Sequence, residues 1–156
     1  MTGTNTVFRI DIDETRHPVV AYGEKCLGGT IRIGDFTESF EVPVDLWSVA
    51  DYKRQWQEGI GRFLAGTAPS CLVTGMRDPE QGVLITIWPL YVEHENNGAV
   101  VIQHKTLFFR DIRMRFTGRN FYDLVGPREF MTEDGDPISE WVIARSSLVD
   151  FLKELD

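Results

Sequence analysis

The sequence contains few of the residues from which catalytic and metal sites are usually built. It has three histidines, His17, His94 and His104, and two cysteines, Cys26 and Cys71, which are not in a CxxC spacing. A GxGxxG phosphate loop and a GxSxG nucleophile elbow are both absent. We therefore expect no enzymatic activity and no bound metal or cofactor. The isolated cysteines favour buried free thiols in a reducing compartment.

Long hydrophobic segments are missing as well. No apolar run approaches the roughly 20 residues needed to cross a bilayer, and the N-terminal stretch MTGTNTVFRI lacks the basic region and apolar segment of a secretory signal. We expect a cytoplasmic protein with no membrane partner. Because 42% of the 156 residues are hydrophobic and no low-complexity linker divides them, a single domain over residues 1–156 is expected.

Positive charge is also scarce. The 24 acidic residues outnumber the 16 basic ones, which gives a formal net charge of −8. Such a field repels phosphate backbones and attracts basic partners. Excess acid also simply keeps a cytosolic protein soluble, so charge alone leaves both interpretations open.

One stretch opposes the overall charge. The segment KTLFFRDIRMRFTGR, from Lys105 to Arg119, interleaves five basic residues with Phe108, Phe109 and Phe116 and has one aspartate. Basic and aromatic side chains together are what single-stranded nucleic acid binding requires. A small nucleic-acid-binding or ligand-binding domain is therefore the alternative function. The acidic remainder of the chain instead favours internal pairing of this stretch with acidic segments.

The clearest helix signal lies in LWSVADYKRQWQEGIGRFL, residues 46–64. Its apolar residues recur at helical spacing and share one face, which consists of Val49, Tyr52, Trp56, Ile60 and Phe63. Ser48 is predicted to cap the helix in a capping box with Asp51, and Gly66 to end it. Because an aromatic stripe at this spacing is far more often core than cofactor site, we expect this helix to be scaffold.

Apolar or alternating runs predict a series of strands. They cover residues 7–12, 28–33, 36–42, 70–74, 83–92, 99–109 and 138–144, with a shorter one at 19–22. Turn signals in IGDF and ENNGA join neighbouring strands into hairpins, so the sheets are expected to be antiparallel. A two-residue turn at Asn97-Gly98 would place His104 opposite Tyr91. His94 and His104 would then lie on opposite faces of the sheet, which argues against a shared metal site.

The C-terminal stretch SSLVDFLKELD repeats the helical pattern. Ser146 or Ser147 is predicted to cap this helix. Its apolar face consists of Leu148, Phe151, Leu152 and Leu155. We therefore expect an α+β fold of antiparallel sheets in a single domain, in which the order of strands followed by a helix occurs twice.

The acidic clusters are the better candidates for a binding site. The stretch YVEHEN carries Glu93 and Glu95, and the stretch TEDGDP carries Glu133, Asp134 and Asp136 around a glycine. The second cluster lacks the length and ligand series of an EF-hand loop. A solvated acidic turn is the simpler interpretation, and electrostatic docking of a basic partner is the functional one.

Three groups of residues follow one another along the chain. The first, VPVDLWSVADYKRQW, has a P-x-x-x-W-x-x-x-D-Y-x-x-x-W pattern formed by Pro43, Trp47, Asp51, Tyr52 and Trp56, with Leu46 inside it. The second is ITIWPLYVE, residues 85–93, and the third is DGDPISEWVI, residues 134–143, followed by SSLVDFL. In this order they resemble the cytoplasmic immunity proteins of bacterial contact-dependent growth inhibition systems. Residues 1–35 and 105–130 show no such resemblance.

This resemblance implies a non-enzymatic protein that binds a cognate toxin C-terminal domain, commonly a nuclease, and occludes its active site. It also implies antiparallel sheets with a helix after each set of strands. An acidic inhibitor suits a basic nuclease because it can mimic nucleic acid. The candidate toxin contacts are therefore Glu93, Glu95, Glu133, Asp134 and Asp136. Neither a cofactor nor a nucleic acid is expected as a partner.

Overall fold

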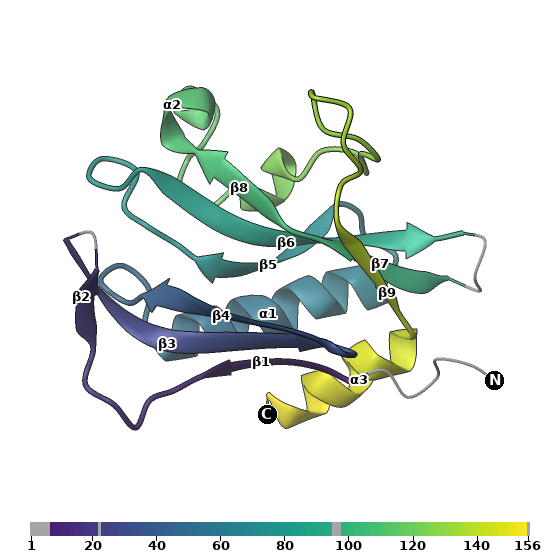
Figure 1. Cartoon of the computed structure of the whole chain (residues 1–156), viewed down its shortest axis with the longest axis horizontal. Helices are drawn as coiled ribbons and strands as arrows, with labels where there is room; N and C mark the ends of the chain where they lie inside the picture. Colours follow the sequence, from purple (N-terminus) through teal and green to yellow (C-terminus); the bar gives the residue numbers. More distant parts are fainter. Residues whose placement is uncertain (1–6, 22, 95–97, 156) are drawn as a thin grey trace.

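The computed structural model describes residues 7–21, 23–94 and 98–155, which form two antiparallel β-sheets and several helices (Figure 1). The first sheet contains β1 (Phe8–Ile12), β2 (Val19–Ala21), β3 (Glu24–Ile33) and β4 (Phe36–Pro43), followed by helix α1 (Val49–Leu64). The second sheet contains β5 (Ser70–Gly75), β6 (Leu84–Glu93), β7 (Ala99–Gln103), β8 (Lys105–Phe108) and β9 (Glu140–Ile143). Between β8 and β9 lie the short helices α2 (Phe109–Ile112) and η1 (Phe121–Leu124), and α3 (Arg145–Glu154) follows β9. The predicted α+β fold of antiparallel sheets, each set of strands followed by a helix, is confirmed.

The first sheet is built around β3. Strands β1 and β2 pair with successive parts of β3, and β4 pairs along almost its whole length, all in antiparallel fashion. In β1, Phe8 and Ile10 are buried whereas Arg9 and Asp11 are exposed. This alternation is expected for a strand with one face on the core. The predicted strand at 19–22 is confirmed as β2 up to Ala21, and residue 22 lies outside the described residues.

The second sheet is built around β6, and its register corrects the predicted one. Glu93 pairs with Ala99 and Tyr91 pairs with Val101, not with His104. The connection between β6 and β7 is therefore longer than the two-residue turn that the Asn-Gly signal predicted. His104 instead contacts the ring of Trp88, with ring centroids 4.7 Å apart. The prediction that His94 and His104 lie on opposite faces of the sheet assumed the wrong register and is not supported by this pairing.

The predicted strand at 99–109 ends earlier than its apolar pattern suggested. His104 separates β7 from β8, and Phe109 already begins α2. Phe109 is buried, because the start of α2 turns its ring inward against Phe116. An apolar run alone cannot distinguish a strand from the buried first turn of a helix.

Helix α1 follows the sequence prediction closely. Ser48 caps it, and Ser48 and Asp51 form both hydrogen bonds of the capping box. At the other end Gly66 has a φ of +77°, the left-handed conformation that glycine adopts without strain. Tyr52 and Trp56 are fully buried, so the helix is scaffold.

Helix α1 also covers the outer edge of β5. The side-chain amide of Gln55 donates to the carbonyl of Cys71 at 2.9 Å and accepts from the amide of Val73 at 2.7 Å. The indole of Trp56 donates to the carbonyl of Val73 at 2.7 Å. The backbone groups that a neighbouring strand would otherwise bond are thus satisfied by helix side chains, which removes an exposed sheet edge. The helix can approach the strand this closely because residue 59 is glycine. A Cβ atom at this position would collide with the Cys71 carbonyl.

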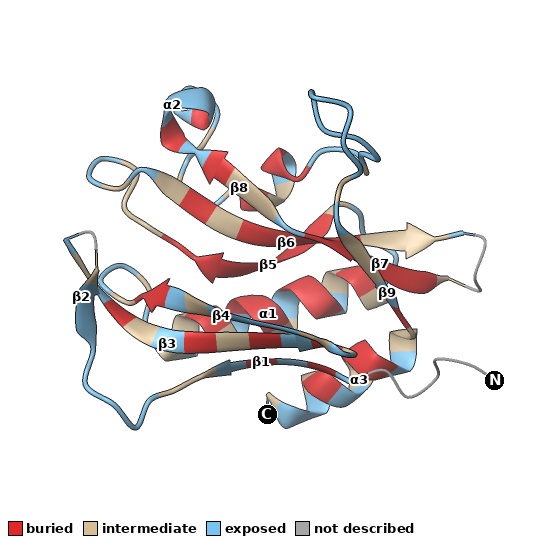
Figure 2. Ribbon diagram, viewed as in Figure 1, coloured by how far each residue is buried: buried red, intermediate tan, exposed pale blue. Residues whose placement is uncertain are grey.

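The core lies between the two sheets and against α1 (Figure 2). Buried positions concentrate on the inner face of β3, on α1 and throughout β5 and β7. Cys26 and Cys71 are buried free thiols, as the sequence predicted. Burial raises the pKa of both thiols, so neither is an activated nucleophile. Within the described residues, no helix combines the length and apolar character required to cross a bilayer.

Helix α3 packs on this core, but its N-terminal cap differs from the prediction. The helix begins at Arg145, and Ala144 occupies the cap position without a side-chain hydrogen bond. Ser146 and Ser147 therefore lie inside the first turn and cannot cap it. The predicted apolar face is confirmed: Leu148 and Phe151 are buried, and Leu152 and Leu155 pack against the core.

Candidate functional site

Three of the predicted acidic residues lie at the tip of a hairpin. Glu133, Asp134 and Asp136 are exposed in the turn that connects Phe130 to Ile138. The amide of Ile138 donates to the carbonyl of Phe130 at 3.1 Å. Closer to the tip, further backbone hydrogen bonds from Thr132 and Gly135 close the turn. We call the segment from Phe130 to Ile138 the acidic hairpin.

The two other predicted residues lie elsewhere. Glu95 falls outside the described residues. Glu93 ends β6, and its side chain is only 20% exposed because it forms an ion pair with Arg128 at 3.5 Å. Figure 1 shows the acidic hairpin at the top of the view and the end of β6 at the right. Arg128 also stacks on Phe130, so the structure places Glu93 near the base of the acidic hairpin and not at its exposed tip.

Arg128 fastens the base of the acidic hairpin to the second sheet. Its guanidinium donates to the carboxylate of Glu140 and stacks over the ring of Phe130, 4.7 Å from the centroid. The hydrogen bond from Arg128 holds the pKa of the Glu140 carboxyl below its usual value. Gln103 donates a further hydrogen bond to Glu140 at 2.9 Å. The hairpin tip is thus exposed, whereas its base is held by the contacts of Arg128 with Phe130 and Glu140.

The phenylalanines of the basic stretch differ in their exposure. Phe109 is buried and stacks on the half-buried Phe116, with ring centroids 5.9 Å apart. Lys105 donates to the carbonyl of Val125 at 2.9 Å. Of the three phenylalanines in the stretch, only Phe108 is exposed, and Arg110 lies over its ring. Phe109 is therefore unavailable for stacking on bases, and Phe116 already stacks on it with one face.

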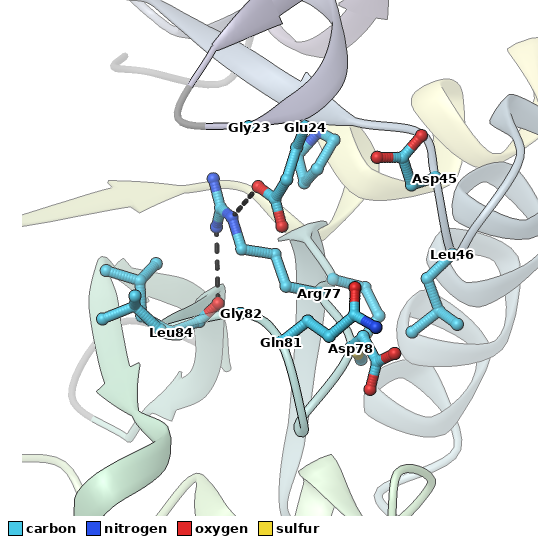
Figure 3. A pocket seen from close by; sticks show the side chains of 12 residues that line it. Gly23, Glu24, Asp45, Leu46, Arg77, Asp78, Gln81, Gly82 and Leu84 are labelled. Carbon is cyan, nitrogen blue, oxygen red and sulfur yellow. Dashed lines mark hydrogen bonds and ion pairs between the residues drawn. The ribbon is translucent and has the colours of Figure 1, made fainter.

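The structure also contains a cleft that the sequence did not predict. Its volume is about 900 Å³, and it lies where the β2–β3 turn, the β4–α1 loop and the β5–β6 loop meet (Figure 3). We call it the acidic cleft. Its lining includes Glu24, Pro43, Asp45, Leu46, Met76, Arg77, Asp78, Gln81, Val83 and Leu84. These residues come from three distant segments, so no local spacing pattern marks them, and only Pro43, Asp45 and Leu46 lie within one of the three sequence groups.

Two interactions tie the sheets together at the acidic cleft. The phenol of Tyr52 accepts from the amide of Met76 at 2.9 Å and donates to the carbonyl of Pro43 at 2.6 Å. Burial raises the pKa of Tyr52, so the phenol remains protonated and can donate. Arg77 pairs with Glu24 at 2.7 Å, as Figure 3 shows, and both side chains are mostly buried. These contacts therefore hold Pro43, Met76, Arg77 and Glu24 in place around the cleft.

The described residues contain no candidate metal centre. Among them, no group of three or more His, Cys, Asp or Glu side chains is placed to hold a metal ion. The candidate site is therefore a pair of acidic surfaces, the hairpin and the cleft, on a protein of net charge −8. Such surfaces suit recognition of a basic partner.

Comparisons with known proteins agree with this picture. The model of the CdiI N-terminal domain family matches residues 42–151. The protein named Immunity protein CdiI from Enterobacter cloacae subsp. cloacae is 31% identical over 139 residues, which cover 89% of this chain and 93% of the relative. A chain of the solved CdiA-CT/CdiI toxin and immunity complex from Enterobacter cloacae superimposes with a TM-score of 0.82 at 30% identity. The alignment covers 96% of this chain and 98% of that one.

The matched region begins at the end of β4 and reaches into α3, so it includes α1, the second sheet and the acidic hairpin. All three sequence groups lie within it, and so does the stretch SSLVDFL except for its last residue, Leu152. The chain belongs to the CdiI family of contact-dependent growth inhibition immunity proteins.

Proposed function

We propose that this protein binds the C-terminal domain of a cognate contact-dependent growth inhibition toxin and blocks it. The observation that carries the proposal is the match to a chain of a solved toxin and immunity complex over almost the full length of both chains. Immunity requires that the inhibitor meet the toxin where it acts, so the proposed compartment is the cytoplasm. The protein acts by binding alone, as a non-enzymatic inhibitor without a cofactor.

The proposed toxin is a nuclease, and the proposed mechanism is occlusion of its active site. A nuclease needs a basic surface to hold its polyanionic substrate, and this chain carries a net charge of −8. Complementary charge accelerates association, and the bound inhibitor then occupies the surface that nucleic acid needs. Nucleic acid itself has no role as a partner in this proposal, since Phe109 and Phe116 pack against each other.

The acidic hairpin is proposed as one toxin contact. Glu133, Asp134 and Asp136 are exposed, and the Arg128 contacts below them hold the hairpin base in place. Glu93 and Glu95, at and beyond the end of β6, remain part of the proposed contact. Glu93 contributes less direct charge, because Arg128 already pairs with it.

The experiment measures binding of the toxin domain encoded beside this chain. Glu133, Asp134 and Asp136 are changed together to Lys, and association is followed at two salt concentrations. Because exposed charges mainly set association rate, we expect binding about tenfold slower at low salt, with a flatter salt dependence and an unchanged melting temperature. A matched control changes Asp35, Glu38 and Glu41, three exposed acids of the first sheet, to Lys.

The possible outcomes distinguish the proposed hairpin contact from the proposed function. Equal slowing in both triple variants would show that only net charge matters and would remove the hairpin from the contact. Failure of the unaltered chain to bind this toxin domain or to protect cells from it would contradict the proposed function itself.

A further inference from the structure

We propose that the acidic cleft receives a lysine or arginine side chain of the cognate toxin, presented beside an apolar side chain. This inference rests on the proposed function and adds a second toxin-binding surface, separate from the acidic hairpin. In Figure 1 the segments that form the cleft lie at the left end of the view, whereas the acidic hairpin is at the top right. Variants of the two surfaces can therefore be examined separately.

The shape of the acidic cleft suits a protruding side chain. A volume of about 900 Å³ lies within the range of pockets that enclose ligand groups. Its lining includes the buried residues Pro43 and Met76, whereas Leu46 and Val83 are 49% and 67% exposed. Exposed apolar side chains beside a concave surface are typical of protein interaction sites, where a partner removes them from water.

The charge of the acidic cleft selects a cation. Three carboxylates line it, those of Glu24, Asp45 and Asp78, against the single guanidinium of Arg77. Arg77 is already engaged by Glu24 at 2.7 Å, so it neutralises that carboxylate and leaves the two aspartates. Asp45 accepts a hydrogen bond from the Lys25 amide through Oδ2. Asp78 likewise accepts one from the Glu80 amide through Oδ1, so each aspartate uses one carboxylate oxygen in these contacts and, among the described residues, presents the other to a ligand.

Lysine and arginine have the two properties that this lining demands. Their long aliphatic stems pack on apolar surface, while the charged head remains with polar groups. Here the stem would contact Leu46 and Val83, and the head would reach Asp45 or Asp78. Figure 3 shows Asp78 and Gln81 on the Leu46 side of the cleft, away from the Arg77 guanidinium. An acidic or purely apolar side chain would leave the two aspartates without a counter-charge.

The acidic cleft needs little rearrangement to bind. Tyr52 joins Pro43 to Met76 behind the cleft, and the Arg77–Glu24 pair joins the β5–β6 loop to β3. Arg77 also donates to the carbonyl of Leu84 at 3.4 Å. A preformed pocket loses less conformational freedom on binding, which favours its use as an anchor point.

The first experiment tests the sign of the charge at one position. Gln81 is exposed and lines the cleft, and its backbone amide, which Arg and Glu both retain, donates to the carbonyl of Asp78. Binding of Gln81→Arg and Gln81→Glu to the cognate toxin is compared at two salt concentrations. We expect Gln81→Arg to weaken binding about tenfold and Gln81→Glu to preserve or strengthen it, with the difference shrinking at high salt. Equal affinities for the two variants would contradict the proposal that a cationic side chain occupies the cleft.

The second experiment blocks the cleft mouth. Val83→Arg is compared with Val142→Arg, a matched substitution of an exposed valine on β9. We expect Val83→Arg to weaken toxin binding about tenfold or more, and Val142→Arg to bind within about twofold of the unaltered chain. Both variants should keep the melting temperature, because neither valine is buried. Unchanged affinity of Val83→Arg would show that the toxin does not cover the cleft.

Two further results would reassign the cleft or the function. Light scattering of the free chain should show a monomer, and a dimer that Val83→Arg dissociates would assign the cleft to a second copy. An unaltered chain that does not bind the toxin at all would instead contradict the proposed function. Loss of binding in the hairpin variant alone, with the cleft variants unaffected, would overturn only this inference.

Discussion

The carbonyl oxygen of Cys71 occupies the space where Gly59 would carry a Cβ atom. This contact sets the distance between α1 and the edge of β5, and it lets Gln55 and Trp56 reach the strand backbone. The hydroxyl of Ser70 donates to the Gly59 carbonyl at 2.6 Å in the same place. Gly59, which lowers the helix propensity of α1, is therefore required for the packing of α1 against the edge strand β5.

Two glycines of α1 should respond to alanine in opposite directions. Gly59→Ala places a methyl group against backbone that cannot move aside, and we expect a loss of about 1–3 kcal/mol in the free energy of unfolding. At Gly61 a Cβ meets nothing within 4 Å, so Gly61→Ala should stabilise the protein by about 0.5–1 kcal/mol. Denaturant unfolding of both variants measures the two effects. Similar values for the two substitutions would contradict the close packing of α1 on β5.

Trp56→Ala should destabilise the protein by about 3–5 kcal/mol, the usual cost of deleting a large core aromatic. Trp56 is 1% exposed and donates to the carbonyl of Val73. Trp56→Phe retains much of the buried ring but leaves that carbonyl unpaired, so its loss should be smaller. Thermal melting of both variants measures the order. A change in Trp56→Ala as small as that of a surface substitution would refute the scaffold role of this face.

Tyr52→Phe should destabilise the protein by about 1–3 kcal/mol, because it leaves buried backbone groups of Pro43 and Met76 without their hydroxyl partner. Tyr91→Phe is the control. The Tyr91 hydroxyl is 3.3 Å and 3.4 Å from carbonyl acceptors at a half-buried position, so its removal should cost less. Chemical denaturation compares the two, and an equal or reversed order would show that Tyr52 does not join the sheets.

Glu140→Gln should change the pH dependence of stability. The hydrogen bond from Arg128 lowers the folded-state pKa of Glu140 below its ordinary value of 4.5, so the unfolded state binds the proton more tightly. The carboxylate therefore contributes stability above about pH 4.5, and this contribution is lost as the pH falls through the lower folded-state pKa.

At neutral pH we expect Glu140→Gln to cost about 1–2 kcal/mol, since the side chain is mostly buried beside a charged partner. The difference from the unaltered chain should narrow as the pH falls below the ordinary glutamate value. Urea unfolding over a pH series measures it, with Glu133→Gln at the exposed hairpin tip as a control that should change little. A difference that is constant with pH would rule out ionic stabilisation by Glu140.

The sequence by itself determined the elements whose signals are local. The apolar face of α1, the Ser48–Asp51 capping box and the glycine at its end depend on residues within a few positions of one another, and all three are present. Alternation in β1 and the turn between β3 and β4 are similarly local. The acidic hairpin could be recognised as a turn, but its anchoring by Arg128 to Glu140 could not.

Only the tertiary structure decided how these elements meet. The register of β6 against β7, the start of α3 and the contact of α1 with the β5 edge depend on which faces pack together in the core. The acidic cleft is the strongest case, because Glu24, Tyr52 and Arg77 meet only after the two sheets have packed. Hydrophobic burial fixes that arrangement through many contacts distant in sequence, and no spacing pattern along the chain encodes it.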